Sequence, residues 1–318
     1  RSTQSSSSAA SDVYKRQIIY MANSVSVAVA ESLPSTYEEY KNLSKDDRLA
    51  LTGQGGKLGN MLPKLKINYA SEVEEDGKDI SIPKGQWTIT FRDADDKPVM
   101  AFAEKITMRA FIRGYRYSIW DTDNEKLILL SSIFRNWNES VIDTLGNEHT
   151  AGKYKKVMIN DFPEYETAVT QLKCQQIIYG RVTFEDAVNI HKKPVEVVDL
   201  PVAWVAKGSG FMPVSNAIKK LTDRKVEMEY YPFTITTHKL KKGAVTYWEP
   251  VLEENAPVEY TEDDFLLTAR FLETITTDNN EVLAAFQKRL ESDKSDASAD
   301  NIIDGSDLSS DFDDEIPL

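Results

Sequence analysis

The sequence predicts a mainly β protein with added helices, because three patterns follow one another along the chain. From Leu62 to about Phe134, apolar and polar residues alternate with period two between short turn sequences. Past Pro257 the period becomes helical, and from Glu291 large apolar residues almost vanish until Phe312. Alternation is typical of strands with one buried face, whereas a period near 3.6 is typical of amphipathic helices.

Two repeated strand–turn–strand patterns open the β region and indicate antiparallel sheet. The stretches LPKLKINY and ISIPKGQWTITF flank the turn EEDGKD, and KITMRAFIRGYRYSIW and KLILLSSIF flank DTDNE. Turn sequences of this kind between alternating stretches favour hairpins. Further strands are predicted at QQIIYGRVTF, PVEVVDLPVAWVA, VEMEYYPFTITTHKL and AVTYWEPVLE. Short strands at this spacing suit a barrel or sandwich better than a parallel sheet.

Three helices are predicted after the first strands. One lies near VSNAIKKLTDR, with Ser215 as its candidate cap. The stretch TEDDFLLTARFLETI opens with Thr261 and Asp264 as a capping-box-like pair, and NNEVLAAFQKRLE predicts a second C-terminal helix.

The chain divides into five segments by composition. Ser7 to Gln17 can be encoded by a transposon-based sequencing adapter, so we interpret residues 1–20 as adapter and read-through, with Met21 as the expected start. The other segments are an N-terminal arm with one helix (21–61), a β core (62–258), C-terminal helices (259–290) and a disordered acidic tail (291–318).

Charge is concentrated at the C-terminal end of the chain. The formal net charge is -13, and residues 291–318 alone carry -9. Nucleic-acid binding would therefore depend on local cationic patches rather than on the charge of the whole protein.

Several classes of protein find little support in the sequence. No stretch is long and apolar enough for a membrane helix and no secretory signal is present, so we expect a cytoplasmic protein. With Cys174 as the single cysteine and three scattered histidines, we expect no metal site and no cofactor. The acidic groups in DADD and DTDNE sit where turns are expected, and no catalytic motif has the required spacing, so we expect no enzyme.

One predicted strand mixes guanidinium groups with aromatic rings on a single face. Alternation across KITMRAFIRGYRYSIW sets Ile106, Met108, Ala110 and Ile112 on the opposite face. Cations along phosphates and flat rings for exposed bases are what an unpaired nucleic-acid strand requires. The candidate contacts on this face are Arg109, Phe111, Arg113, Tyr115 and Tyr117. The alternative is that the rings pack under neighbouring elements while the arginines extend to solvent.

Further aromatic and basic residues recur in the same β region. They lie in FRNW, KYKK and HKLKKGAVTYW. From the first two runs we take a second set of candidate contacts, namely Arg135, Trp137, Lys153, Lys155 and Lys156.

The last eight residues are DFDDEIPL, an acidic stretch that ends in apolar residues. This ending resembles the tip of bacterial single-stranded DNA-binding proteins, and acidic tips with terminal hydrophobes also occur in those of tailed phages. Leu318 stands where the bacterial tip usually has Phe. The resemblance implies an oligonucleotide-binding (OB-fold-like) antiparallel barrel in the β core, in a phage version with added helices. It also implies that the tip recruits replication, recombination and repair enzymes through Asp311, Phe312, Asp313, Asp314, Glu315, Ile316, Pro317 and Leu318.

Together these observations predict sequence-independent binding of single-stranded DNA in phage replication and recombination, in the host cytoplasm. Expected partners of the tip are a polymerase, a helicase or primase, and a nuclease. An acidic tail is repelled from bound DNA, and without DNA it can occupy the cationic groove itself. Two alternatives stay open. One is an adaptor that uses the tail without binding DNA, and the other is a metal-dependent nuclease.

Overall fold

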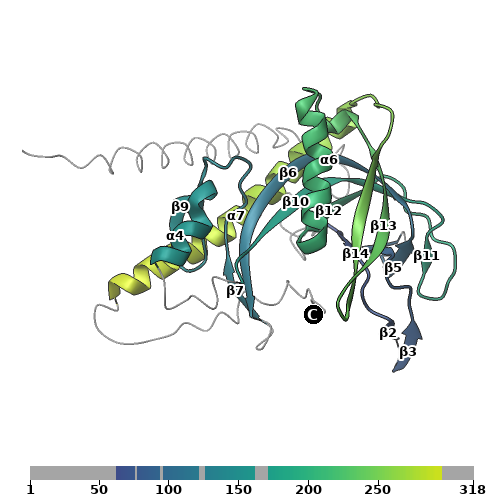
Figure 1. The fold of residues 1–318 in the computed structure, drawn as a ribbon, viewed down its shortest axis with the longest axis horizontal. Helices are drawn as coiled ribbons and strands as arrows, with labels where there is room; N and C mark the ends of the chain where they lie inside the picture. The colour runs from purple at the N-terminus through teal and green to yellow at the C-terminus, as the bar shows by residue number, and fades with distance from the viewer. Residues whose placement is uncertain (1–61, 76, 94–95, 122–125, 162–170, 296–318) are drawn as a thin grey trace, which may run out of the picture. The chain divides into compact units, whose positions relative to one another are not determined.

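The structure is a computed structural model that describes residues 62–75, 77–93, 96–121, 126–161 and 171–295 (Figure 1). These residues belong to one compact unit that begins at Leu62. The helix expected in the N-terminal arm and the tail from residue 296 onward lie outside the described residues.

The prediction of a mainly β fold is confirmed. The main sheet has ten strands in the order β11-β5-β4-β1-β12-β10-β6-β13-β14, and β7 pairs with β6 beside this path. Its pairs are antiparallel except for β1 with β12. The strands are β1 Lys64–Ile67, β4 Trp87–Arg92, β5 Pro98–Ala103, β6 Ile106–Asp121, β7 Lys126–Leu130, β10 Lys173–Phe184, β11 Val188–Asn189, β12 Leu200–Ala206, β13 Phe233–Lys242 and β14 Val245–Glu254.

Smaller elements complete the described part of the chain. Two small sheets pair β2 (Glu72–Glu75) with β3 (Lys78–Ser81), and β8 (Ser140–Ile142) with β9 (Glu148–Thr150). The turn EEDGKD thus joins β2 to β3 rather than the two longer stretches predicted to flank it. The helices are α4 Tyr154–Asp161, α6 Phe211–Asp223 and α7 Glu262–Ser295, with the short 3-10 helices η1 Ala151–Lys153, η3 Gly208–Gly210 and η4 Met228–Tyr230.

Strand β6 is the centre of the fold, and a bulge in it changes which way its side chains point. Along its pairing with β10, Tyr179 lies opposite Ile112 and Gly180 lies opposite Ala110, so Phe111 has no partner. An extra residue of this kind reverses the alternation beyond it. The backbones approach so closely here that a Cβ on Gly180 would lie 2.2 Å from the carbonyl oxygen of Arg109, which explains the glycine.

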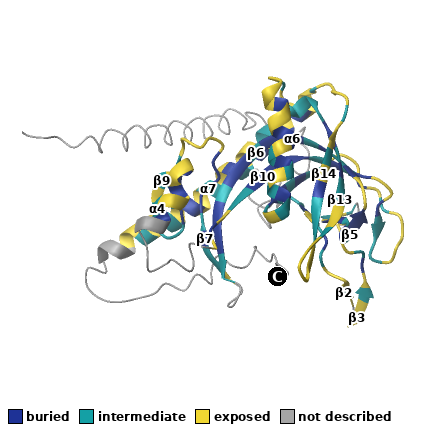
Figure 2. Ribbon diagram, viewed as in Figure 1, coloured by how far each residue is buried: buried dark blue, intermediate teal, exposed yellow. Residues whose placement is uncertain are grey.

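Side chains of β6 enter three separate buried clusters, and Figure 2 shows the buried residues along β6 and β10. Ile106 and Met108 pack in the largest cluster, which α6 covers. Phe111 and Ile112 pack against α7, and beyond the bulge Tyr115 and Tyr117 pack against the segment that leads to α4. Both faces of β6 are therefore covered.

The C-terminal region forms one long helix instead of the two that were predicted, since α7 runs without interruption from Glu262 to Ser295. Its capping-box-like start is confirmed, because the Thr261 backbone N–H donates to the Asp264 carboxylate over 2.9 Å and the Asp264 N–H reaches Thr261 Oγ1 over 3.3 Å. The predicted cap Ser215 is wrong, because α6 starts four residues earlier at Phe211 and Ser215 lies inside it.

Candidate nucleic-acid interface

The expectation that Phe111, Tyr115 and Tyr117 lie together on an open surface is wrong. Their exposed fractions are 6%, 7% and 5%, so their faces are not free to stack on bases. The bulge in β6 also divides them, because Phe111 packs against Phe271 of α7 whereas Tyr115 and Tyr117 belong to another cluster. The alternative of rings packed under neighbouring elements holds in the structure.

Arg109 links α7 to the sheet through hydrogen bonds of its guanidinium group. Its guanidinium donates to Asp264 over 2.8 Å and to the backbone oxygens of Glu229 and Glu259 over 2.6 and 2.9 Å. Arg181 reaches the other oxygen of the same carboxylate over 3.6 Å. These contacts use the donors that phosphate recognition would require, so Arg109 is a structural residue here.

The Asp264 carboxyl has a lowered pKa despite its burial. Burial alone would raise the pKa, but hydrogen bonds from the backbone and hydroxyl of Thr261 and the charges of Arg109 and Arg181 outweigh it. Asp264 therefore stays ionised at the junction of α7 and the sheet.

Arg113 is also held by protein contacts. Its guanidinium lies over the Tyr115 ring, 4.7 Å from the centroid, and donates to Gln176 Oε1 and Ser215 Oγ, each over 2.9 Å. Burial lowers the pKa of Arg113, partly offset by Tyr115 and Cys174. Arg113 thus links β6 to β10 and α6.

The second set of predicted contacts is exposed, and it lies in two segments that a backbone hydrogen bond joins. We call this set the Trp137 platform; it consists of Arg135, Trp137, Lys153, Lys155 and Lys156. Trp137 is 43% exposed, and the backbone N–H of Gly152 donates to its carbonyl oxygen over 2.8 Å. This bond sets the loop that carries Arg135 and Trp137 beside η1 and the first turn of α4, where the lysines lie.

Buried rings support Trp137 from within. Its ring centroid lies 4.8 Å from that of Tyr115 and 5.3 Å from that of Phe134. Tyr115 therefore takes part in the candidate site as a support rather than as a contact. Aromatic support of this kind restricts an exposed ring to one orientation, which lowers the entropy lost when a ligand stacks on it.

A buried hydrogen-bond network, which no sequence motif indicates, fixes the start of α4. The Tyr154 hydroxyl donates to the fully buried Asp143 carboxylate, to which the Asn147 side chain also donates over 2.9 Å. Burial first, and Asp143 second, raise the pKa of Tyr154, so its hydroxyl remains a donor. Tyr154 stacks on Tyr117 with centroids 4.6 Å apart. Tyr154 belongs to the run KYKK, and only the packing separates it from its exposed lysine neighbours.

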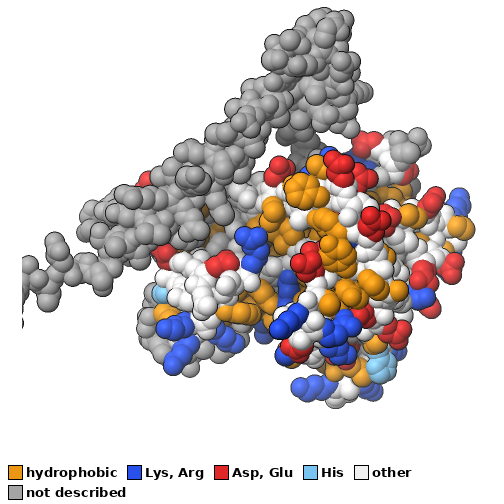
Figure 3. Space-filling view, turned by 90° about the horizontal axis from the view of Figure 1, so that it is seen from above, with side chains coloured by type: hydrophobic (Ala, Val, Ile, Leu, Met, Phe, Trp, Pro, Cys, Tyr) orange, Lys and Arg blue, Asp and Glu red, His pale blue; other side chains and the backbone are white. Residues whose placement is uncertain are grey.

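The cations of the described surface form separate groups. Figure 3 shows Lys and Arg side chains on one face in several clusters between hydrophobic and acidic side chains. Around the Trp137 platform, the exposed Glu139 and Glu148 lower the local positive charge. Binding of a polyanion at the platform therefore needs the aromatic contact as well as the charges.

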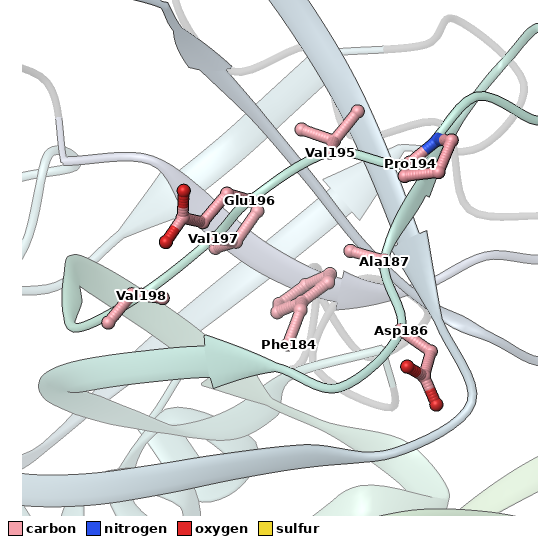
Figure 4. Close-up of a pocket in the computed structure, with 8 residues that line it drawn as sticks. All are labelled: Phe184, Asp186, Ala187, Pro194, Val195, Glu196, Val197 and Val198. Atoms are coloured by element: carbon pink, nitrogen blue, oxygen red, sulfur yellow. The ribbon is translucent and has the colours of Figure 1, made fainter.

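Metal ligands and surface grooves are the other features of the described residues that could mark a site. No group of three or more metal-ligating side chains occurs within them. Two adjoining open grooves, of about 410 and 520 Å³, share the segment from Pro194 to Val198. Figure 4 shows the first groove, where Asp186 and Glu196 point away from each other. Neither groove contains a predicted site residue.

Comparison with protein-family models, with curated proteins and with solved structures gave no match. Among the helices that the structure describes, none has the length and apolar character to cross a membrane. The fold and the site thus define a mainly β protein whose surface carries a supported, partly exposed tryptophan among lysines and an arginine.

Proposed function

We propose that this protein binds single-stranded DNA without sequence preference and without catalysis, through an OB-fold-like core, in phage replication and recombination. The observation that carries the proposal is the Trp137 platform, in which a supported tryptophan and four exposed cations lie on two segments joined by a backbone hydrogen bond. The acidic tail with its DFDDEIPL tip is the second support, and it lies outside the described residues. In this proposal the tip recruits replication and recombination enzymes.

The platform has the two components that single-strand binding uses. A base stacked on an aromatic side chain contributes about 1–3 kcal/mol, whatever the base. Each phosphate neutralised by a lysine or arginine on single-stranded DNA changes the slope of log K against log salt concentration by about -0.7. Binding at the platform is therefore tolerant of sequence and sensitive to salt.

Replacing Trp137 by alanine tests the platform. We expect the Kd for labelled oligo-dT to rise about tenfold, because one stacking contact is lost. The variant Lys155→Glu with Lys156→Glu should weaken binding further and reduce its salt dependence. Fluorescence titration at two salt concentrations measures both effects.

The matched control is Lys192→Glu with Lys193→Glu in an exposed turn next to β11, at the far end of the sheet order. Equal affinity of platform variants and wild type, with unfolding curves that coincide, would contradict the platform assignment.

Removal of the tail tests two proposed roles, namely that it binds partner enzymes and that it competes with DNA for the cationic site. Because α7 continues to Ser295, the truncation should start at Asp296. We expect the affinity for oligo-dT to stay equal or increase, since a strongly acidic segment is repelled by DNA and competes for the same cations. Capture of replication enzymes by the immobilised protein should be lost at the same time. A large decrease in DNA affinity would rule out the competitor role.

A second candidate function is that of an adaptor that recruits enzymes through the tail and binds no DNA. The burial of Phe111, Tyr115 and Tyr117 favours this candidate, because it removes the face first expected to bind DNA. The same titration separates the two functions, since an adaptor shows no oligo-dT binding at either salt concentration.

A further inference from the structure

The distal part of β13 and β14 projects beyond the rest of the sheet as a two-stranded ribbon, which we call the hairpin arm (His238–Glu249). The two strands pair continuously from Phe233 with Glu254 to Lys242 with Val245. Strand β13, however, pairs with β6 only through Phe233–Ile235. A two-stranded ribbon is marginally stable alone in water, so the arm depends on contacts at its base.

The base of the arm is firmly anchored by Trp248. Its ring lies edge-on to Tyr69, 5.5 Å between centroids, and so close to Gly85 that a Cβ there would lie 1.9 Å from the indole nitrogen. The hydroxyls of Tyr69 and Ser209 both donate to the Trp248 carbonyl oxygen, over 3.3 and 2.9 Å. The arm is therefore a preorganised element with a fixed base.

The tip of the arm is a tight turn. Lys242 pairs with Val245 across Gly243 and Ala244, and Gly243 has a φ of 62°. A positive φ at the first central position is what a two-residue II′ turn requires, and glycine adopts it without strain. The lysines next to the turn are thus held at defined positions.

The arm carries only positive charge up to its last residue. The sequence contains no acidic residue between Glu229 and Glu249, whereas Lys239, Lys241 and Lys242 are all exposed. Lys239 lies 5.9 Å from the centroid of Trp248. In a protein with a net charge of -13, such a segment is a local site of positive potential.

Apolar side chains lie next to the cations, on the face of the arm that also carries Lys242. Tyr247 lies directly opposite Leu240, and both are partly exposed, while Val245 is 52% exposed. Lysines on an edge strand can serve simply to prevent sheets from joining edge to edge. That role needs a charge of either sign, whereas contact with phosphates needs a positive one.

We propose that the hairpin arm is a second contact for the phosphodiester backbone of the same single strand that occupies the Trp137 platform. This inference rests on the proposed function. The arm joins β6 at Ile106–Met108, whereas Tyr115 supports Trp137 further along the strand. Seven residues from Met108 to Tyr115 span about 23 Å at about 3.3 Å per residue. Strand β13 runs away from Tyr115, because Phe233 pairs with Met108 and Ile235 pairs with Ile106. The nine residues from Phe233 to Lys242 at the tip of the arm therefore add up to about 30 Å. Figure 1 likewise shows the β13–β14 ribbon and the α4 region at different ends of β6. A short oligonucleotide therefore reaches one site only, and a long one reaches both.

The test compares the full chain with the variant Lys241→Glu with Lys242→Glu, using labelled oligo-dT of about 6 and about 30 nucleotides. We expect the affinity for the long oligonucleotide to fall about tenfold and the magnitude of its salt slope to fall by about 1.4, since two phosphate contacts are lost. Affinity for the short oligonucleotide should stay within about twofold, because the platform is intact. The reversed charges still protect the edge of β13 in the arm, so solubility and unfolding should not change.

The outcomes separate this inference from the proposed function. The control Lys192→Glu with Lys193→Glu should bind both oligonucleotides as the wild type does. If the arm variant binds the long oligonucleotide like the wild type, or loses both oligonucleotides equally, the arm is no separate contact and the proposed function stands. If the wild type itself binds neither, the proposed function fails and the arm inference fails with it.

Discussion

Replacing Asp264 by alanine is expected to lower the free energy of unfolding by about 3 kcal/mol, because it leaves two arginines without their shared carboxylate. Asp264 is 1% exposed and lies 2.8 Å from Arg109 and 3.6 Å from Arg181. The arginine side chains keep some contact with water, at 16% and 25% exposure, which sets the loss at the lower end of the usual range. Urea unfolding followed by circular dichroism measures it.

The neighbouring Asp263→Ala is the matched control. Asp263 also lies in the first turn of α7 but is exposed, so its removal should cost less than about 1 kcal/mol through the helix dipole. Equal losses for the two variants would show that the buried ion pairs do not stabilise the attachment of α7.

The contribution of Asp264 also has a defined pH dependence. Because the folded-state pKa lies below that of the unfolded chain, the stabilisation is fully present above about pH 4 and is lost as the pH falls through the folded pKa. The difference in stability between the wild type and Asp264→Ala should therefore narrow in acid.

Replacing Tyr117 by alanine is expected to cost about 3–5 kcal/mol of stability, because a large buried ring leaves a cavity. The ring stacks on Tyr154 at 4.6 Å and on Phe134 at 5.5 Å, and its hydroxyl donates to the carbonyl oxygen of Ala151 over 2.8 Å. Since Phe134 supports Trp137 and Tyr154 begins α4, the variant should also loosen the Trp137 platform.

Tyr117→Phe is the matched control, and it should cost only about 1 kcal/mol for the lost hydrogen bond. Burial, with a smaller effect of Cys174, raises the pKa of Tyr117 to about 12. In the unfolded chain the phenol ionises near pH 10. The free energy of unfolding should therefore decrease as the pH rises from about 10 to 12. Tyr117→Phe should lack the contribution of this ionisation to the decrease. If Tyr117→Ala unfolds at the same midpoint urea concentration as the wild type, this result would contradict the buried position of the ring.

The candidate site was predicted in part. Trp137 and the lysines of KYKK were found from residue type alone, and they are exposed in the structure. Arg109 and Arg113 have the same residue type as a phosphate contact, yet they bind Asp264, Gln176 and Ser215. Residue type states what a side chain is able to bind, whereas its partners depend on segments that lie far away in the chain.

Local order was readable from the amino acids, because it depends on neighbours a few residues apart. Alternation predicted β6, β10, β12 and β13, and the spacing of Thr261 and Asp264 predicted where α7 begins. The exposure of each face of β6 depends on packing between segments that lie far apart in the sequence. The bulge in β6 requires Gly180 on the neighbouring strand β10. Phe111 is buried by Phe271 of α7, about 160 residues further along the chain. Alternation defines two faces of a strand, but only the elements packed against them decide whether either face stays open.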